Sequence, residues 1–340
     1  MANGVADRRE YCTAPVHDSR FTIHDWPKRL IAVQACLAAA VAPWYAAYGL
    51  HIDWRSAALL PVAHVSLVAA WWYCRRRYST HPGKSIYADV ILATLVLLLV
   101  TNIASPAQYL AVALRRPLID DWLVRADAAL GIDVAALAAW TRSHPTVSLV
   151  LSACYASLIV QFLMPLLIVG LRDRDRVRLW EYVFHFNFCL IVTVATLAIF
   201  PAECSFTHLG FTPTIDQTRV ITQISALRAG TFRTIDFGNL DGLVSMPSFH
   251  AAGAIIVTWA FRRRRIFFSM LTLLNAGLIA ATFMSGVHYF VDILGAFALF
   301  GVSVAAFRLF SRAPVAAPIE ARAAGWRPPR WPRAARTSPD

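Results

Sequence analysis

Long apolar runs alternate with short polar and basic segments along most of the chain. A helix needs ~20 apolar residues to cross ~30 Å of hydrocarbon at a rise of about 1.5 Å per residue. Eight runs reach or approach that length, so the pattern predicts an all-α integral membrane protein with about eight transmembrane helices. The runs cover residues 30–50, 56–74, 87–110, 147–171, 180–200, 247–262, 266–286 and 289–310.

Lys and Arg are concentrated in every second connecting segment. If the N-terminus is cytoplasmic, the cytoplasmic segments hold 24 of the 32 Lys and Arg residues, in line with the positive-inside tendency. The pattern therefore places both termini in the cytoplasm and the segments around residues 250 and 288 on the outer side. We expect a multi-pass protein of a plasma (inner) membrane whose active site faces the periplasmic or outer side.

The chain divides into one membrane domain and two polar tails. Residues 1–29 lack a charged start followed by an apolar core and a cleavage site, so they indicate a retained cytoplasmic tail rather than a signal peptide. Residues 311–340 are rich in Ala, Pro and Arg, which predicts a disordered basic cytoplasmic tail. We expect the membrane catalytic domain to span residues 30–310.

Two outer segments are long, residues 114–146 and 201–246. The first predicts one or two short interfacial helices, with apolar side chains on one face and aspartates, among them Asp120 and Asp127, on the other. Asp133 is the expected N-cap of the second helix. The segment 201–246 mixes Pro, Thr, Gly, Asp and Arg without clear periodicity, and a long loop beside a site is typical of a lid or substrate wall.

Composition narrows the classes of function. The chain is 58% hydrophobic and 15% charged, which is too apolar for a soluble domain of 340 residues. Its net charge of +12 lies in short clusters between apolar runs, without a basic face that interleaves aromatics, so no nucleic-acid partner is expected. The six cysteines form neither a CxxC pattern nor a disulfide framework. We expect no cofactor.

Two histidines, His250 and His288, stand at the ends of apolar runs. His288 and Asp292 are four residues apart, so on one helix face the carboxylate can accept a hydrogen bond from one ring nitrogen and fix the tautomer. The other nitrogen then presents a lone pair, which predicts a nucleophile with its orienting carboxylate. His250 starts another helix, where unpaired N–H groups favour an anion such as phosphate, and Ser248 can add a hydroxyl donor.

Two other uses of these side chains stay open. Zinc or iron needs three or four ligands, but metal ligation does not explain the Pro-Ser-x-His context, so no metal site is predicted. The alternative from a different class is a non-catalytic lipid transporter that keeps a phosphate site. Charged midplane residues or broken helices in paired halves would favour transport, and the sequence shows none clearly. The ligands of the alternative zinc or iron site would be His208, His250, His288 and Asp292.

The sequence Pro247-Ser248-Phe249-His250, followed after one hairpin by His288-Tyr289-Phe290-Val291-Asp292, resembles two signature motifs of the type 2 phosphatidic acid phosphatase superfamily. The fuller run is similar to the branch that contains inositol phosphorylceramide synthase. The resemblance implies a six-helix core, made of the third to eighth predicted helices, with two added N-terminal helices. It also implies that His288 attacks phosphorus to form a phosphohistidine, that Asp292 orients it, and that His250 protonates the leaving oxygen without a metal.

Two departures from the superfamily pattern remove expected cations. Ala281 and Thr282 stand where the third motif usually has Ser-Arg, and the first-motif lysine is missing near the run Ile199-Phe200-Pro201. We therefore expect outer arginines to bind the phosphate, because a guanidinium can donate two hydrogen bonds to it. The four candidates are Arg115, Arg116, Arg228 and Arg233.

Together these observations predict a membrane lipid phosphotransferase that moves a phosphate or phospho-headgroup to or from a lipid through a phosphohistidine intermediate. The missing cations favour transfer, as in inositol phosphorylceramide synthase, over hydrolysis by a lipid phosphate phosphatase. Both reactions share one covalent intermediate and differ only in the acceptor. The pattern predicts no particular oligomeric state.

Overall fold

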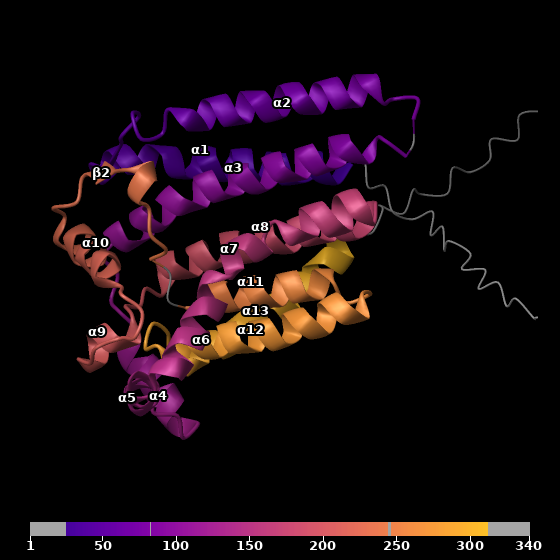
Figure 1. Ribbon diagram of the computed structural model, residues 1–340. Helices are drawn as coiled ribbons and strands as arrows, with labels where there is room; N and C mark the ends of the chain where they lie inside the picture. The colour runs from indigo at the N-terminus through magenta and orange to yellow at the C-terminus, as the bar shows by residue number, and fades with distance from the viewer. Residues whose placement is uncertain (1–24, 82, 244–245, 312–340) are drawn as a thin grey trace, which may run out of the picture.

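The structure is a computed structural model that describes residues 25–81, 83–243 and 246–311. Long helices run side by side and form a bundle (Figure 1). The predicted N-terminal tail, apart from its last residues, and nearly all of the predicted basic C-terminal tail lie outside the described residues. The long helices are α1 (Trp26–Ala47), α2 (Leu59–Arg77), α3 (Ile86–Ala113), α8 (Arg176–Ile199), α12 (Arg265–Met284) and α13 (Phe290–Phe310), and the shorter α11 (Phe249–Ala260) packs against α8, α12 and α13.

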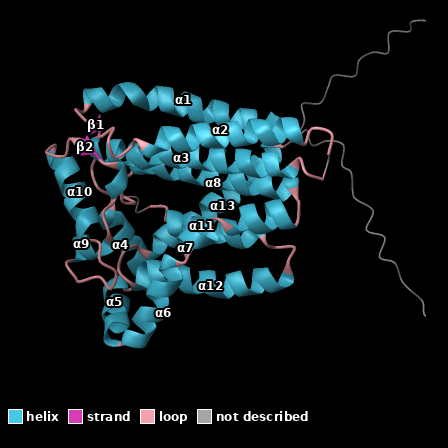
Figure 2. Cartoon of the chain, turned by 45° about the horizontal axis from the view of Figure 1, so that its top comes forward, coloured by secondary structure: helices cyan, strands magenta, loops and turns pink. Residues whose placement is uncertain are grey.

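Short elements gather at one end of the bundle, on the left in Figures 1 and 2. Helix α1 starts and helix α13 ends at the opposite end. A two-residue parallel ladder pairs β1 with β2, a small exception to the all-α expectation. The short elements are β1 (His51–Ile52), α4 (Asp120–Ala129), α5 (Val134–Ser143), α9 (Ser205–Leu209), α10 (Thr218–Ala229), β2 (Thr234–Ile235) and the 3-10 turn η3 (Phe237–Asn239).

Helix α11 packs closely against its neighbours, because small residues follow Phe249 and His250 at its start. Ala251, Ala252 and Ala254 are fully buried, and Gly253 faces the ring of Phe162 so closely that a Cβ there would lie 2.7 Å from it. Small residues allow helices to approach closely inside a membrane, where packing rather than water drives association. This approach brings the start of α11, which carries His250, against its neighbours α8, α12 and α13.

The expected count of eight transmembrane helices is not confirmed. Within the described ranges, five helices are long and apolar enough to cross a membrane, and a sixth span results if the bent pair 134–143 and 145–161 is counted as one. Helix α11 is apolar but only 12 residues long. Helix α2 ends in Arg75, Arg76 and Arg77, and none of the side chains along this fully described helix is buried. Several apolar helices nevertheless make this a multi-pass membrane protein.

The predicted helix 147–171 is broken rather than continuous. It forms α6 (Pro145–Ala156), the short α7 (Leu158–Gln161) and a π-helical segment η2 (Pro165–Arg172). Ser157 sits at the first break, where its hydroxyl donates to the carbonyl of Cys154 at 2.6 Å and competes with the helical pattern. Pro165 has no N–H and cannot continue the α-helical ladder.

The two outer segments are more ordered than the sequence suggested. Residues 114–146 do form two helices, and Asp133 caps α5 by accepting from the N–H of Ala136 at 2.9 Å. The expectation that Asp120 and Asp127 lie on a polar outer face was wrong, since both are buried. The expectation of an irregular segment 201–246 was also wrong, because it contains α9, α10 and β2.

Candidate active site

The site forms where the starts of α11 and α13 meet. The N–H of Ser248 donates to the backbone carbonyl of Asp292 at 3.2 Å, which joins the two segments directly. Ser248 is the N-cap of α11, and its hydroxyl accepts from the N–H of Ala251 at 3.3 Å. His250 is therefore in the first turn of α11, as the sequence predicted.

His288 lies just before α13 rather than on it, which corrects the expected placement on one helix face. The chain turns at Gly286, where φ is +84° and favours glycine, and the N–H of His288 then donates to the carbonyl of Thr282 at 3.0 Å. Asp292 is in the first turn of α13. The pairing expected from the spacing is still made, because the turn and the first helical residues bring the two side chains together.

The imidazole of His288 is held at both nitrogens. Its Nδ1 lies 3.2 Å from Oδ2 of Asp292, which also accepts from the N–H of Tyr289 at 3.0 Å. Its Nε2 lies 3.2 Å from the hydroxyl of Ser248. We assign the proton to Nδ1 because the carboxylate can only accept there, and Nε2 is then the lone pair. Both His288 and Asp292 are buried.

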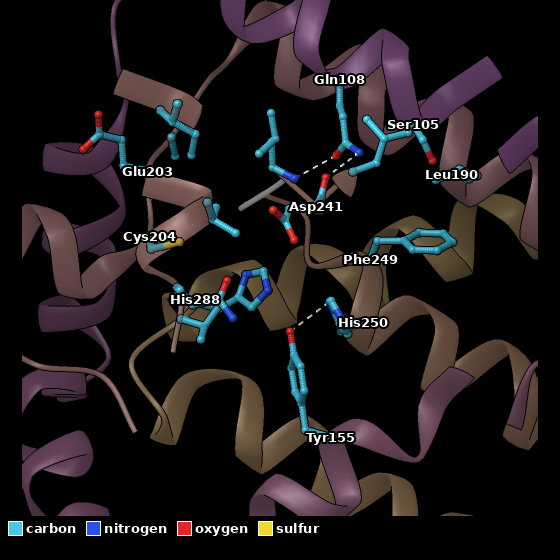
Figure 3. A pocket seen from close by; sticks show the side chains of 18 of the residues that line it. Ser105, Gln108, Tyr155, Leu190, Glu203, Cys204, Asp241, Phe249, His250 and His288 are labelled. Carbon is cyan, nitrogen blue, oxygen red and sulfur yellow. Dashed lines mark hydrogen bonds between the residues drawn. The ribbon is translucent and has the colours of Figure 1, made fainter. Parts of the chain in front are cut away.

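His250 faces this pair from the other side. Its ring centroid is 6.4 Å from that of His288, with an angle of 60° between the planes. Tyr155, from the last turn of α6, stacks on His250 at 4.5 Å between centroids, and its hydroxyl lies 3.4 Å from Nδ1 of His250 (Figure 3). Tyr155 could not be singled out from the sequence, since it lies in an apolar run 95 residues before His250.

Both histidines line a cavity of about 320 Å³ with mostly apolar walls. Gln108 of α3 fixes one wall by holding the loop before α11: its amide donates to the carbonyl of Asp241 at 3.1 Å and accepts from the N–H of Leu243 at 2.8 Å (Figure 3). The walls come from α3, α6, α8, α10 and the segments before α9 and α11. Their side chains include Ser105, Phe162, Phe186, Leu190, Cys204, Val220, Ile224 and Phe249.

A family model described as the PAP2 superfamily matches residues 121–306, more than half of the chain. The chain belongs to the PAP2 superfamily. Its members are phosphatases and phosphotransferases, which supports an enzyme of lipid phosphatase or phosphotransferase type here. The matched range includes both histidines and Asp292, whereas α1, α2 and α3 precede it. No curated protein and no solved structure matches the chain.

The cavity of this PAP2 superfamily protein carries acidic groups, and no Lys or Arg is found among its lining residues. Burial, and then the neighbouring charge of Asp120, raise the pKa of Glu203. Asp241 is neutralised from outside the cavity by Arg219, whose guanidinium donates to both carboxylate oxygens at 2.6 Å. Burial raises the pKa of the Cys204 thiol to about 12, so this thiol is not a nucleophile.

The four arginines expected to bind phosphate do not line the cavity. Arg228 donates to the carbonyl of Arg116 at 3.1 Å and joins α10 to the end of α3, while Arg233 donates to the carbonyl of Tyr48 at 3.2 Å. Arg115 lies against Gly230. The side chains of Arg115, Arg228 and Arg233 therefore contact backbone at the surface of the bundle rather than the cavity. Of these four arginines, Arg228 acts on a lining residue, since its charge offsets part of the rise in the pKa of Glu203 that burial and Asp120 cause.

The alternative metal site is not assembled. His208 lies 3.2 Å from Asp121 at the protein surface instead of joining His250 and His288. Over the described stretches of the chain, no group of three or more His, Cys, Asp and Glu side chains is placed to hold a metal ion.

Proposed function

We propose that this PAP2 superfamily protein is a membrane lipid phosphotransferase that works through a phosphohistidine on His288. The observation that carries the proposal is the orientation of His288, whose Nδ1 is held by Asp292 while Nε2 lies beside the Ser248 hydroxyl, in a side chain that lines the same cavity as His250. A neutral imidazole oriented by a carboxylate is an activated nucleophile.

In the first half-reaction, Nε2 of His288 forms a bond to phosphorus as the bond from phosphorus to the lipid oxygen breaks. His250 gives a proton to that leaving oxygen. In the second, an acceptor hydroxyl attacks phosphorus, gives its proton to His250 and releases His288. In-line displacement of this kind depends mainly on positioning and on stabilisation of the equatorial oxygens.

Uncharged donors near His288 can meet the equatorial oxygens. The hydroxyl of Ser248 and the hydroxyl of Tyr155 both lie at the histidines. The N-terminus of α11 adds the positive end of a helix of 12 residues. These groups support phosphate binding without arginine, and they favour a singly charged phosphodiester over a doubly charged monoester. Transfer of a phospho-headgroup, as in the inositol phosphorylceramide synthase branch, fits this preference.

The arrangement of charge also supports an orientation in the membrane. The end of α2, the connection from η2 to the start of α8 and the connection from α11 to α12 lie at the end of the bundle opposite the site (Figure 1). These segments carry Arg75–Arg77, Arg172–Arg178 and Arg262–Arg265. The positive-inside tendency then puts that end in the cytoplasm and the site on the outer side. A lipid would reach the cavity from the outer leaflet.

The experiment uses purified protein in detergent, a labelled lipid phosphodiester, a panel of hydroxyl acceptors and a chelator. Wild type is expected to move phosphorus to an acceptor and to give an acid-labile, base-stable phosphoprotein after rapid quenching. His288→Ala should lose both the label and the product, and Asp292→Asn should lower the rates of both strongly while leaving a measurable residual kcat. Activity in His288→Ala, or a chelator-sensitive wild type, would overturn the proposal. Release of the label as a free, water-soluble phosphate rather than on an acceptor would identify a phosphatase. Undiminished lipid movement in His288→Asn would identify a transporter.

A further inference from the structure

The first turn of α13 is held by a carboxylate from outside the helix. The first N–H groups of any helix have no partner within it and need another acceptor. Here the N–H of Phe290 donates to Oδ2 of Asp127, and the N–H of Val291 to Oδ1, each at 2.9 Å. Asp127 belongs to α4, and its sequence separation from these two residues exceeds 160. It therefore acts as an N-cap supplied by a distant element.

A second carboxylate of α4 holds the residue between His288 and this turn. The hydroxyl of Tyr289 donates to Oδ1 of Asp120 at 2.8 Å. The N–H of Glu203 donates to both oxygens of Asp120, at 3.1 and 3.2 Å. Asp120, Tyr289 and Asp127 are all buried. Helix α4 thus binds the turn of α13 and the segment after α8 at once.

These contacts reach Tyr289, the residue next to the reacting histidine. Residues 289 to 291 connect His288 to Asp292 in the chain, and the N–H of Tyr289 shares Oδ2 of Asp292 with the ring of His288. Burial, and to a smaller extent the charge of Asp292, raise the pKa of Asp127. Any movement of this turn therefore changes the distance from Nδ1 to Oδ2 and the direction of Nε2.

We infer that Asp127 and Asp120 are positioning residues for phosphoryl transfer, an inference that rests on the proposed function. They touch no substrate and act through the turn that carries His288 and Asp292. Burying carboxylates is unfavourable unless each is fully hydrogen-bonded, and here each binds two or more donors of the catalytic region. A misplacement of about 1 Å in a reacting group can cost ~10²-fold in rate.

The test compares Asp127→Asn and Asp120→Asn with Asp121→Asn in the full-length protein in detergent. Asp121 is a matched control on the same helix, since its side chain is 80% exposed and contacts only His208 among the ion pairs of the site region. An asparagine at 127 offers one acceptor and places an NH₂ group against a backbone N–H. We expect kcat to fall about 100-fold in Asp127→Asn and about tenfold in Asp120→Asn, with KM within about threefold. Asp121→Asn should match wild type.

A double-mutant cycle distinguishes positioning from general destabilisation. If Asp127 acts through Asp292, adding Asp127→Asn to Asp292→Asn should reduce kcat by less than about threefold further, because residues that act as a unit are not additive. Wild-type kcat in Asp127→Asn, or losses that multiply in the double variant, would overturn the inference. Tyr289→Phe removes one hydroxyl and tests the Asp120 contact if the aspartate variants do not fold; unchanged kcat there counts against it. Activity in His288→Ala would instead defeat the proposed function itself.

Discussion

His250 and His288 face each other across the cavity, with 6.4 Å between their ring centroids. They come from the first turn of α11 and from the residue pair before α13, two segments joined by one backbone hydrogen bond from Ser248 to Asp292. A phosphoryl group between the rings would have the nucleophile on one side and the proton donor on the other. This is the arrangement that in-line displacement needs.

The leaving group should decide how much His250 matters. A lipid alkoxide needs a proton as it leaves, so His250→Ala is expected to lower kcat by ~10²- to 10⁴-fold on a lipid phosphodiester. The nitrophenolate of a nitrophenyl ester leaves without a proton. On such a substrate His250→Ala should therefore lower kcat by less than about tenfold. Rapid-quench kinetics on both substrates gives the comparison. Equal losses on both would show that His250 is not the acid.

Ser248 has two roles that can be separated. Ser248→Ala removes the N-cap of α11, which should cost about 1 kcal/mol of stability, and removes the hydroxyl at Nε2 of His288, which should lower kcat about tenfold. Asp133→Ala removes one comparable cap from α5, away from the cavity. It should lower the melting temperature similarly and leave kcat unchanged. If both variants keep wild-type kcat, Ser248 is only a cap.

Tyr155 should orient His250 through its hydroxyl and its ring. Tyr155→Phe loses a hydrogen bond of 3.4 Å and keeps the stack, so kcat should fall about two- to tenfold, as expected for a single hydrogen bond. Tyr155→Ala loses both contacts, so its kcat should be lower still. Steady-state kinetics on the lipid substrate measures both variants. Identical kcat values for the two variants would assign the whole effect to the hydroxyl.

Surface arginines should contribute little to phosphate binding. Arg116→Ala and Arg233→Ala are expected to change kcat/KM by less than about threefold, since neither side chain lines the cavity and exposed charges interact weakly with distant groups. Arg228→Ala should have the largest effect of the set, because Arg228 acts on Glu203. A loss near 100-fold in Arg116→Ala would support the expectation drawn from the sequence.

Glu203 should make the protein less stable as the pH rises. Its pKa is raised on folding above the ordinary 4.5, mainly by burial, so the folded state binds the proton more tightly than the unfolded state. Stability is then present below pH 4.5 and is lost as the pH rises through the folded pKa. In detergent, the melting temperature of Glu203→Gln should fall less steeply with rising pH than that of wild type. Some slope should remain, because burial also raises the pKa of Asp120 and Asp127.

The sequence was most informative where chemistry is local. The start of α11, the pairing of His288 with Asp292 and the cap at Asp133 depend on residues within four positions of each other. The superfamily recognised from the two motifs is confirmed, whereas its inositol phosphorylceramide synthase branch stays a prediction. The membrane helices were predicted from apolar length alone, so α2 and the short α11 were counted with the rest.

Contacts between distant segments could not be predicted from the pattern. Asp120 and Asp127 look like the polar face of an interfacial helix, yet both face inward because α13 offers them unpaired donors. One missed signal was present: Val220, Ile224 and Leu227 recur at helical spacing and form the buried face of α10. The position of the arginines outside the cavity could not be predicted, because sequence proximity to α3 and α11 says nothing about the direction of a long side chain.

The ladder between β1 and β2 ties the connection of α1 and α2 to the chain just before α11. His51 and Asp53 donate to carbonyls of Arg233 and Ile235 at 2.8 and 2.9 Å, and the N–H of Phe237 donates to Ser56 at 2.9 Å. In evolutionary terms, a helical hairpin that touched only lipid could be gained or lost independently of the matched range. This hairpin has a fixed register with a loop inside that range. A chimera that grafts it onto another superfamily member must therefore carry residues 233–237 with it.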